Sequence, residues 1–345
     1  MKLPVIDQVE VDGKRVFIRG DIDIPLTGGK IVDETRLLDI WPTLEFLLKK
    51  DCLVFLGGHL GRPGGKEVTT LSSQPVAEWL AQKVGGSVSG VCLKGDICGF
   101  LVNDKLTVLE NLRFDPREEA SDEVYAQELA SLADVYVDEA FGACYENHTS
   151  LALIPNFLPH FAGLRLAKEV EKLSAVLENP RRPVLVIIGG AKTESKVPVI
   201  AGIQKLADRI LLGGKIVVDV FSYAREHKMN LDPEKVTALP LTADFKDIFA
   251  QAIANMAPDF INAGTIVWNG PFGAVEEEGS QLGTRMVADL ILGNPRAYKV
   301  VGGGDTVAFL DKLKVTNKFD WVSSGGGSML KFLAGEKLPG IEALR

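Results

Sequence analysis

The chain has 345 residues, 46% of them hydrophobic and 24% charged, which is typical of globular proteins and excludes disordered, collagen-like and disulfide-scaffold classes. This length suggests two domains and is ample for buried cores. The net charge of −8 argues against a general nucleic-acid or membrane-surface binder.

Short apolar, β-branched runs alternate with helical patterns along the chain. In the first part we expect a helix over 75–84 and strands at 15–19, 52–56, 106–109 and 135–137. In the second part we expect a helix over 329–333 and strands at 184–188, 209–212, 265–268, 297–301 and 321–322. This alternation predicts an α/β fold of two doubly wound, Rossmann-like lobes with parallel sheets.

Residues 163–179 have a different pattern. Leu166, Val170, Leu173 and Leu177 recur every three or four positions, which predicts the apolar stripe of a helix that ends before Pro180. We interpret this segment as a linker helix between the acidic first part and the glycine-rich second part. The expected organisation is a first lobe at 1–162, the helix at 163–180, a second lobe at 181–330 and a tail at 331–345.

Glycine accounts for 35 residues and follows nearly every expected strand of the second part. These strand ends read VIIGG, ILLGG, VWNGP, VVGGG and VSSGGG. Ligands bind at the carboxyl ends of strands in open parallel sheets, where glycine lets backbone N–H groups face an anion. One Gly-Gly pair indicates only a tight turn, but five predict a phosphate or nucleotide platform. The chain has neither GxxxxGK[ST] nor GxGxxG, which disfavours P-loop and dinucleotide sites.

Charged residues follow these glycines. Lys192 and Lys196 share one face at the start of a helix, where positive charge opposes the helix dipole. Two solvated lysines are the simpler alternative, but contact with phosphate would explain the placement. Asp305 in GGGDT suits a Mg²⁺ ion that bridges phosphates, or a helix cap. The run SSGGGS at 323–328 leads into a helix and predicts a further anion site.

Cationic residues follow the expected strands of the first part, even though residues 1–160 hold 15 Lys and Arg against 25 Asp and Glu. The residues concerned are Arg19, His59, Arg62 and Arg113, with Arg36 just ahead of a helix. Each alone could be a surface residue. Together they predict a pocket for a small polyanion, held by guanidinium groups.

The four cysteines, Cys52, Cys92, Cys98 and Cys144, form no CxxC pair and no zinc-ligand spacing. We therefore expect reduced thiols and a cytoplasmic protein. The first residues contain no apolar leader, and no apolar run approaches the length of a membrane helix.

These motifs resemble those of the phosphoglycerate kinase family over essentially the whole chain and in the same order. The matching segments are RGDIDIP (19–25), HLGRP (59–63), ENLRF (110–114), GGAK (189–192), IVWNGPFGAVE (266–276), GGGDT (302–306), SSGGGS (323–328) and LPG (338–340). The resemblance implies a monomeric glycolytic kinase whose two lobes close around 3-phosphoglycerate and Mg·ATP, with the tail returning to the first lobe.

The resemblance also implies roles for individual residues. The acid-substrate residues would be Asp21, Ile22, Asp23, Arg36, His59, Leu60, Gly61, Arg62 and Arg113, with Glu146 at a diverged position. The nucleotide residues would be Lys196, Gly213, Gly214, Asn269, Glu276, Gly303, Gly304, Asp305 and Thr306, with Asp305 on Mg²⁺. The residues that hold the transferred phosphoryl would be Arg36, Lys192, Gly325, Gly326 and Gly327. The nucleophile is a substrate carboxylate, already ionised at neutral pH, so no general base is needed.

The sequence departs from the family pattern in the first part. Asp23 stands where the family has asparagine, and Gly58 stands where it has serine. Tyr145 and Glu146 replace a His-Arg pair, and the lost arginine contacts the substrate phosphate in the family. That loss alone predicts acid binding weaker by about 10- to 150-fold. We expect a competent nucleotide half and a weakened or repurposed acid half, unless Arg165 supplies the missing cation.

Two readings remain open, and a third fails. The leading one is the reaction ATP + 3-phosphoglycerate ⇌ ADP + 1,3-bisphosphoglycerate. The alternative is a weakened nucleotide-binding paralogue or a kinase for a related acid, favoured by Glu146, Asp23 and a shortened stretch at 230–248. A nicotinamide dehydrogenase fails because the dinucleotide fingerprint is missing.

Overall fold

Two hydrophobic cores form around two separate sheets in the computed structural model, which describes residues 1–345. Unit 1 comprises Met1–Glu171 and Lys337–Arg345, and unit 2 comprises Lys172–Glu336. Helix α4 (Leu164–Glu178) runs through the boundary, so one continuous helix belongs to both units. None of the helices is both long and apolar enough to cross a membrane.

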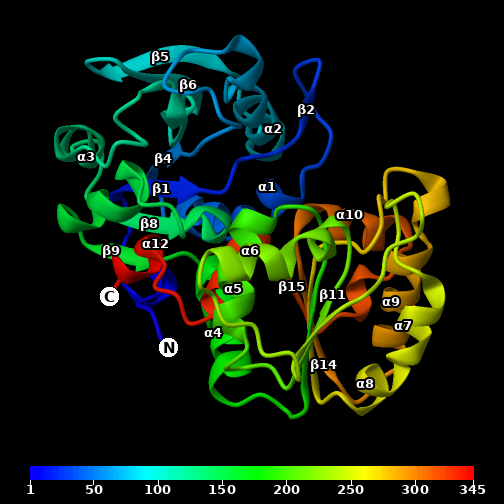
Figure 1. The fold of residues 1–345 in the computed structure, drawn as a ribbon. Helices are drawn as coiled ribbons and strands as arrows, with labels where there is room; N and C mark the ends of the chain where they lie inside the picture. Colours follow the sequence, from blue (N-terminus) through cyan, green and yellow to red (C-terminus); the bar gives the residue numbers. More distant parts are fainter. The chain divides into compact units, whose positions relative to one another are not determined.

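The sheet of unit 1 has seven strands in the order β5-β6-β7-β4-β1-β8-β9 (Figure 1). Their bounds are β1 Arg15–Gly20, β4 Leu53–Gly57, β5 Ser89–Lys94, β6 Ile97–Asn103, β7 Leu106–Leu109, β8 Val135–Glu139 and β9 His160–Ala162. The central strands are parallel, whereas β6 is antiparallel to both β5 and β7. From β1 the chain adds β4 and β7 on one side and β8 and β9 on the other, so the direction of winding reverses between β1 and β8.

Helices cover this sheet through apolar faces. Their bounds are α1 Thr35–Lys49, α2 Gln74–Val84 and α3 Glu123–Ala130, and a small hairpin pairs β2 Leu26–Thr27 with β3 Lys30–Ile31. Helix α2 has a proline in its first turn and ends at Gly85, whose φ of 74° is the left-handed conformation common at helix ends. Asp122 caps α3 by accepting a hydrogen bond from the Tyr125 N–H at 2.7 Å.

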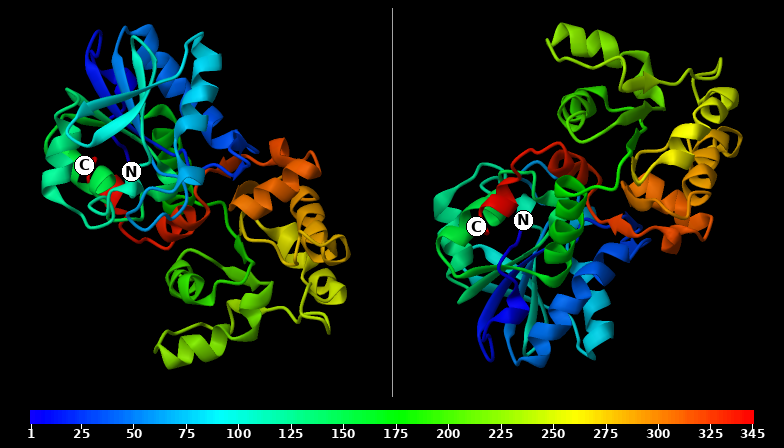
Figure 2. Two further views of the ribbon diagram at one scale, coloured as in Figure 1. Left: turned by 90° about the horizontal axis from the view of Figure 1, so that it is seen from above. Right: turned by 90° about the horizontal axis from the view of Figure 1, so that it is seen from below.

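The last nine residues belong to unit 1 and end in helix α12 (Pro339–Glu342). Leu338, Ile341 and Leu344 are each no more than 2% exposed. The Gly340 N–H donates to the Cys144 carbonyl at 3.0 Å. Figure 2 shows the two chain ends side by side on this unit.

The sheet of unit 2 is parallel throughout, in the order β12-β11-β10-β13-β14-β15. Its strands are β10 Val184–Ile188, β11 Arg209–Leu212, β12 Val236–Ala238, β13 Thr265–Asn269, β14 Tyr298–Gly302 and β15 Trp321–Ser323. Every residue of β10 and β13 is buried, as expected for central parallel strands covered on both faces. The winding reverses between these two strands.

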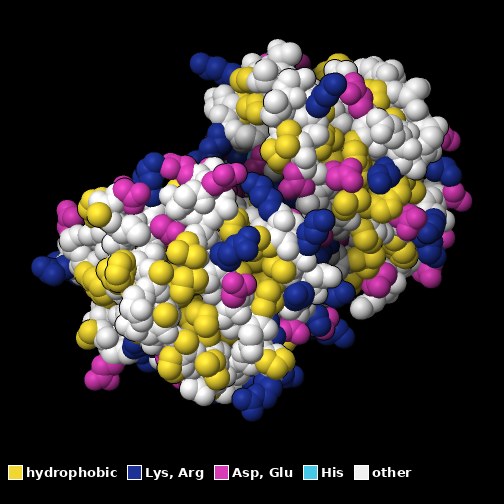
Figure 3. All heavy atoms as spheres, turned by 90° about the vertical axis from the view of Figure 1, so that its right-hand side faces the viewer, with side chains coloured by type: hydrophobic (Ala, Val, Ile, Leu, Met, Phe, Trp, Pro, Cys, Tyr) yellow, Lys and Arg dark blue, Asp and Glu magenta, His cyan; other side chains and the backbone are white.

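The helices of unit 2 lie on both faces of its sheet. They are α5 Thr193–Ile203, α6 Val220–Glu226, α7 Ala250–Asn255, α8 Ala257–Asn262, α9 Leu282–Leu292, α10 Gly304–Lys312 and α11 Gly326–Leu333. In Figure 1, α5 and α6 lie on one side of the strands and α7, α8 and α9 on the other. Figure 3 shows the face that carries α7 and α9, where hydrophobic side chains lie between acidic and basic ones.

The α/β fold with two mainly parallel sheets confirms the predicted fold class. The prediction missed the antiparallel strands β5 and β6; most residues of β5 are exposed, and none is fully buried. In α4, Leu166, Val170 and Leu173 are buried as expected, but Leu177 is 36% exposed and Val176 is buried in its place. The stripe therefore advances by three residues after Leu173 rather than by four.

The expectation of four reduced cysteines was wrong. Cys92 on β5 and Cys98 on β6 form a disulfide. The two residues are directly opposite in the antiparallel register, so the hairpin brings them together. Because the hairpin was not predicted, the sequence spacing of six carried no signal. Cys52 and Cys144 are free and buried.

Candidate functional site

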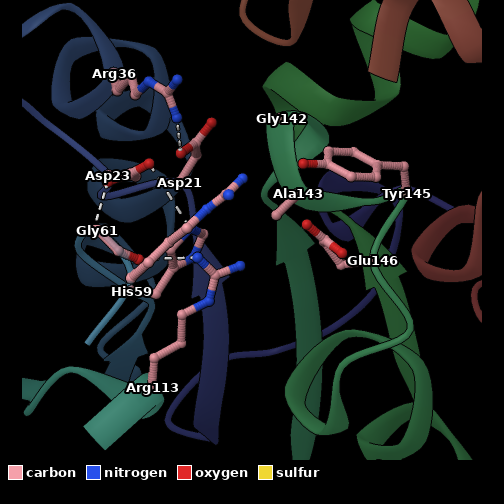
Figure 4. A pocket seen from close by; sticks show the side chains of 11 residues that line it. Asp21, Asp23, Arg36, His59, Gly61, Arg113, Gly142, Ala143, Tyr145 and Glu146 are labelled. Atoms are coloured by element: carbon pink, nitrogen blue, oxygen red, sulfur yellow. Dashed lines mark hydrogen bonds and ion pairs between the residues drawn. The ribbon is translucent and has the colours of Figure 1, made fainter. Parts of the chain in front are cut away.

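A pocket of about 240 Å³ lies where the parallel strands of unit 1 end. This is the edge where ligands bind in open α/β sheets, at the place where the winding reverses. The residues that follow β1, β4, β7 and β8 line it, together with one arginine from α1. The lining residues are Asp21, Asp23, Arg36, His59, Gly61, Arg62, Arg113, Gly142, Ala143, Tyr145 and Glu146 (Figure 4).

Arg36 and Asp21 form an ion pair at one end of the pocket. Arg36 Nη1 donates to Asp21 Oδ1 at 2.5 Å, and this pairing raises the pKa of the guanidinium. The other carboxylate oxygen, Asp21 Oδ2, is buried and accepts no hydrogen bond. Gly142 packs closely against this oxygen, since a Cβ at that position would lie 2.5 Å from Asp21 Oδ2.

His59 lines the pocket and contacts Arg19, a buried arginine that does not itself line the pocket. Arg19 is 0% exposed and lies within β1; its Nε donates to Ser150 Oγ at 2.8 Å, and its Nη2 lies 2.9 Å from His59 Nδ1. Burial, and then the charges of Arg19 and Arg113, hold the pKa of His59 well below its usual value. The imidazole is thus uncharged at neutral pH and accepts a hydrogen bond from Arg19.

Arg113 lies at the other end of the pocket. Its Nη1 donates to the Gly61 carbonyl at 2.9 Å, and its Nε lies 3.3 Å from Glu119 Oε1. The Gly61 N–H donates in turn to Asp23 Oδ1 at 2.8 Å. Burial and the charge of Arg19 lower the pKa of Arg113, while Glu119 and Glu146 act in the opposite direction.

The wall opposite Arg113 and His59 comes from the segment after β8, which begins with the turn η4 (Phe141–Ala143). Figure 4 shows the Glu146 carboxylate directed toward Arg113 across the pocket, with the Tyr145 ring beside it. Glu146 Oε2 lies 3.8 Å from His148 Nε2. Burial and Arg113 lower the pKa of His148, so its imidazole is largely neutral, and the groups that interact with the Glu146 carboxylate are the Tyr145 hydroxyl and the charge of Arg113.

Most of the predicted acid-site residues meet in this pocket, with two exceptions. Ile22 is 0% and Leu60 is 1% exposed, and both pack in the hydrophobic core instead of lining the pocket. Their neighbours in the motif point the other way because side chains alternate along extended segments. Arg165 does not line the pocket; it pairs with Asp39 at 3.4 Å and Glu169 at 3.3 Å. Sequence reasoning missed Gly142, Ala143 and Tyr145, although the departure at 145–146 pointed to this wall.

In unit 2, glycines line the carboxyl ends of the strands where the winding reverses. Gly270, directly after β13, has a φ of +92°, and a Cβ there would collide with the Gly189 carbonyl after β10. Lys196, on α5, donates from Nζ to that same carbonyl. Burial is the main reason why the pKa of Lys196 is lowered to about 8; the charge of Asp305 opposes this shift and that of Lys192 contributes to it. At this edge of the sheet the half-buried ammonium group of Lys196 lies beside the backbone of Gly189 and Gly270, which have no side chains.

Two predicted nucleotide residues hold this edge together. Asn269 Nδ2 donates to the carbonyls of Gly302 and Gly326, each at 3.1 Å, and thereby links β13 to the segments after β14 and β15. Thr306 is 0% exposed, and its Oγ1 accepts from the Gly270 N–H at 2.9 Å. Asn269 Nδ2 and Thr306 Oγ1 therefore form hydrogen bonds within the protein.

The remaining predicted residues of unit 2 fall into three groups. Gly213 and Gly214 are buried after β11, against Phe272 and Gly190. Gly303 and Gly325 precede the first turns of α10 and α11, where backbone N–H groups are unpaired within the helix. The exposed members of the set are Lys192, Glu276, Gly304, Asp305 and Gly327, and Gly326 is half-buried.

Comparison with known proteins gives one consistent family. The phosphoglycerate kinase family model matches residues 6–236 and 218–336. The chain is 35% identical to the phosphoglycerate kinase of Moorella thermoacetica, covering 98% of both chains, and 34% identical to that of Leptospira biflexa, covering 100% of this chain and 98% of the relative. The solved phosphoglycerate kinase of Coxiella burnetii has a TM-score of 0.79 at 28% identity, covering 99% of this chain and 98% of its own. That of Pyrococcus horikoshii has a TM-score of 0.83 at 23% identity with the same coverage, which speaks for the fold alone.

Proposed function

This chain belongs to the phosphoglycerate kinase family, and we propose on that basis that it transfers a phosphoryl group between ATP and the carboxylate of 3-phosphoglycerate. The observation that carries the proposal is the pair of strand-end sites. Unit 1 presents an arginine-lined pocket for a small acid, and unit 2 presents a glycine-lined edge with Lys196. A kinase that acts on small acids must bind both an acid and a nucleotide, and these two sites supply one place for each.

The chemistry needs no proton transfer. A carboxylate oxygen forms a bond to the γ-phosphorus while the bond from that phosphorus to the ADP oxygen breaks, which gives an acyl phosphate and ADP. The protein contributes alignment and positive charge around the transferred group. In this proposal Arg36 orients the acceptor carboxylate, and Lys192 and the N–H groups of Gly325–Gly327 stabilise the phosphoryl. Water must be excluded, because it would otherwise accept the phosphoryl.

Asp305 fits the part of a Mg²⁺ ligand. It is exposed in the first turn of α10, and no group of three or more acidic, histidine or cysteine side chains is placed to hold a metal by itself. Mg²⁺ usually binds through one or two carboxylates together with substrate phosphates, which is what a lone Asp305 could support. Bound in this way, the ion would neutralise charge on the phosphate oxygens.

A coupled assay of ADP formation from ATP and 3-phosphoglycerate tests the proposal. We expect turnover by the wild-type protein and a loss of about 10²- to 10³-fold in kcat for Lys192→Met, since one donor to the transferring group is removed. Lys318→Met, at another exposed lysine, is the matched control and keeps full activity. Turnover that is unaffected by Lys192→Met contradicts the assigned role of this lysine.

Glu146 favours a second candidate, a nucleotide-binding paralogue without turnover. A carboxylate in the acid pocket opposes an anionic substrate. Calorimetric titration with Mg·ADP separates the two candidates. Binding of the nucleotide without turnover of any acid in either direction favours the paralogue.

A further inference from the structure

The pocket of unit 1 carries no net formal charge. Three arginines and three carboxylates line it, namely Arg36, Arg62, Arg113, Asp21, Asp23 and Glu146. His59 adds no charge, because it is neutral at neutral pH. Two of the arginines already have partners within unit 1, Arg36 with Asp21 at 2.5 Å and Arg113 with Glu119 at 3.3 Å. The site is therefore poorly matched to a ligand with several negative charges.

The pocket also presents a carboxylate on the wall opposite Arg113. Glu146 accepts a hydrogen bond from the Tyr145 hydroxyl, and its carboxylate faces Arg113 across the pocket (Figure 4). An ionised carboxylate accepts hydrogen bonds and donates none. A ligand group between Arg113 and Glu146 must accept from the first and donate to the second. A hydroxyl group does both, whereas a phosphate dianion only accepts and is repelled by Glu146.

We propose that Glu146 determines specificity, so that this pocket prefers a small carboxylic acid with hydroxyl groups at its far end to one with a phosphate there. The inference rests on the proposed function, in which the acid carboxylate lies at the Arg36 end. A hydroxyl at the far end of the acid then bridges Arg113 and Glu146. A cavity of about 240 Å³ is smaller than the pockets that hold drug-sized ligands, which suits an acid of a few carbons.

Glycerate is the simplest probe, since it has one carboxylate and two hydroxyl groups. The reaction balances as for the phosphorylated acid: the carboxylate oxygen bonds to the γ-phosphorus, the bond to the ADP oxygen breaks, and an acyl phosphate and ADP result. No oxidant, reductant or proton donor is required.

The test compares glycerate and 3-phosphoglycerate in the wild-type protein and in Glu146→Gln. Binding of each acid is measured by calorimetry without nucleotide, and kcat/KM is measured with Mg·ATP. We expect the wild type to favour glycerate in both measurements. Glu146→Gln shifts the ratio toward 3-phosphoglycerate by at least about tenfold, because a charge opposed to the phosphate is removed. Glu123→Gln is the matched control: it removes an exposed charge in the first turn of α3, outside the pocket, and shifts the ratio less than about twofold.

The outcomes separate the two proposals. Tighter binding of 3-phosphoglycerate by the wild type, a ratio unchanged in Glu146→Gln, or binding of neither acid each overturns the specificity proposal. Glycerate binding that depends on Glu146, without turnover of any acid, supports the specificity proposal and refutes the kinase reaction. Melting temperatures of the variants equal to that of the wild type show that the effect is local.

Discussion

Lys196 makes nucleotide binding dependent on pH. Its Nζ donates to the Gly189 carbonyl, and burial lowers its pKa to about 8. The free protein is then about nine-tenths charged at this lysine at pH 7 and about one-tenth charged at pH 9. Phosphate oxygens require the ammonium form. Between these two pH values we expect the affinity for Mg·ADP to fall by about tenfold, since the lysine must take up a proton on binding.

Two variants isolate this effect. Lys196→Met removes a charge-assisted hydrogen bond worth about 1.5–3 kcal/mol, so it weakens Mg·ADP binding by about 10- to 150-fold at pH 7 and abolishes the pH dependence. Lys196→Arg keeps a charge whose pKa is above 12, and its affinity stays constant over the same range. Isothermal titration calorimetry with Mg·ADP across the range measures all three proteins. A wild-type affinity that does not change from pH 7 to 9 would refute the reasoning.

Three further predictions follow from unit 1. Gly142→Ala places a Cβ 2.5 Å from Asp21 Oδ2 and so displaces the Asp21 side chain from its position in the pocket. We expect acid binding, measured by calorimetry, to weaken by about tenfold or more. Gly28→Ala on the exposed hairpin is the control and leaves acid binding unchanged. Burial raises the pKa of Glu139 from 4.5 to about 7, so between these pH values the carboxyl keeps its proton in the native state but loses it on unfolding. The free energy of unfolding therefore falls by about 3 kcal/mol as the pH rises from 4.5 to about 7. Urea titrations of the wild type show this decline, and those of Glu139→Gln do not. Reduction of the Cys92–Cys98 disulfide lowers the free energy of unfolding by about 2 kcal/mol, and dithiothreitol has no such effect on Cys92→Ser.

The central strands of both units could be predicted because a strand buried on both faces consists of apolar residues. The run VLVII at 184–188 is apolar throughout, as a central parallel strand covered on both faces must be. The antiparallel pair β5 and β6 was missed because its residues alternate between partly buried and exposed positions and include Lys94 and Gly90. The disulfide was missed for the same reason.

The candidate site was only partly predictable. Strand-end positions singled out Arg62 and Arg113, because parallel strands bring their carboxyl ends to one edge, whereas Arg36 was singled out by its place just ahead of a helix. The pairing of two of these arginines with Asp21 and Glu119 depends on tertiary contacts that no sequence spacing encodes. Arg19 was expected beside the pocket, yet its side chain is 0% exposed and instead forms a hydrogen bond with His59, which does line the pocket.

The division of the chain has a consequence for synthesis on the ribosome. Unit 2 is one uninterrupted stretch, whereas unit 1 is completed only by Lys337–Arg345. The buried apolar side chains of Leu338, Ile341 and Leu344 become available to unit 1 only after unit 2 has been translated. Unit 1 is therefore not complete until the chain of unit 2, which is inserted within it, has been synthesised.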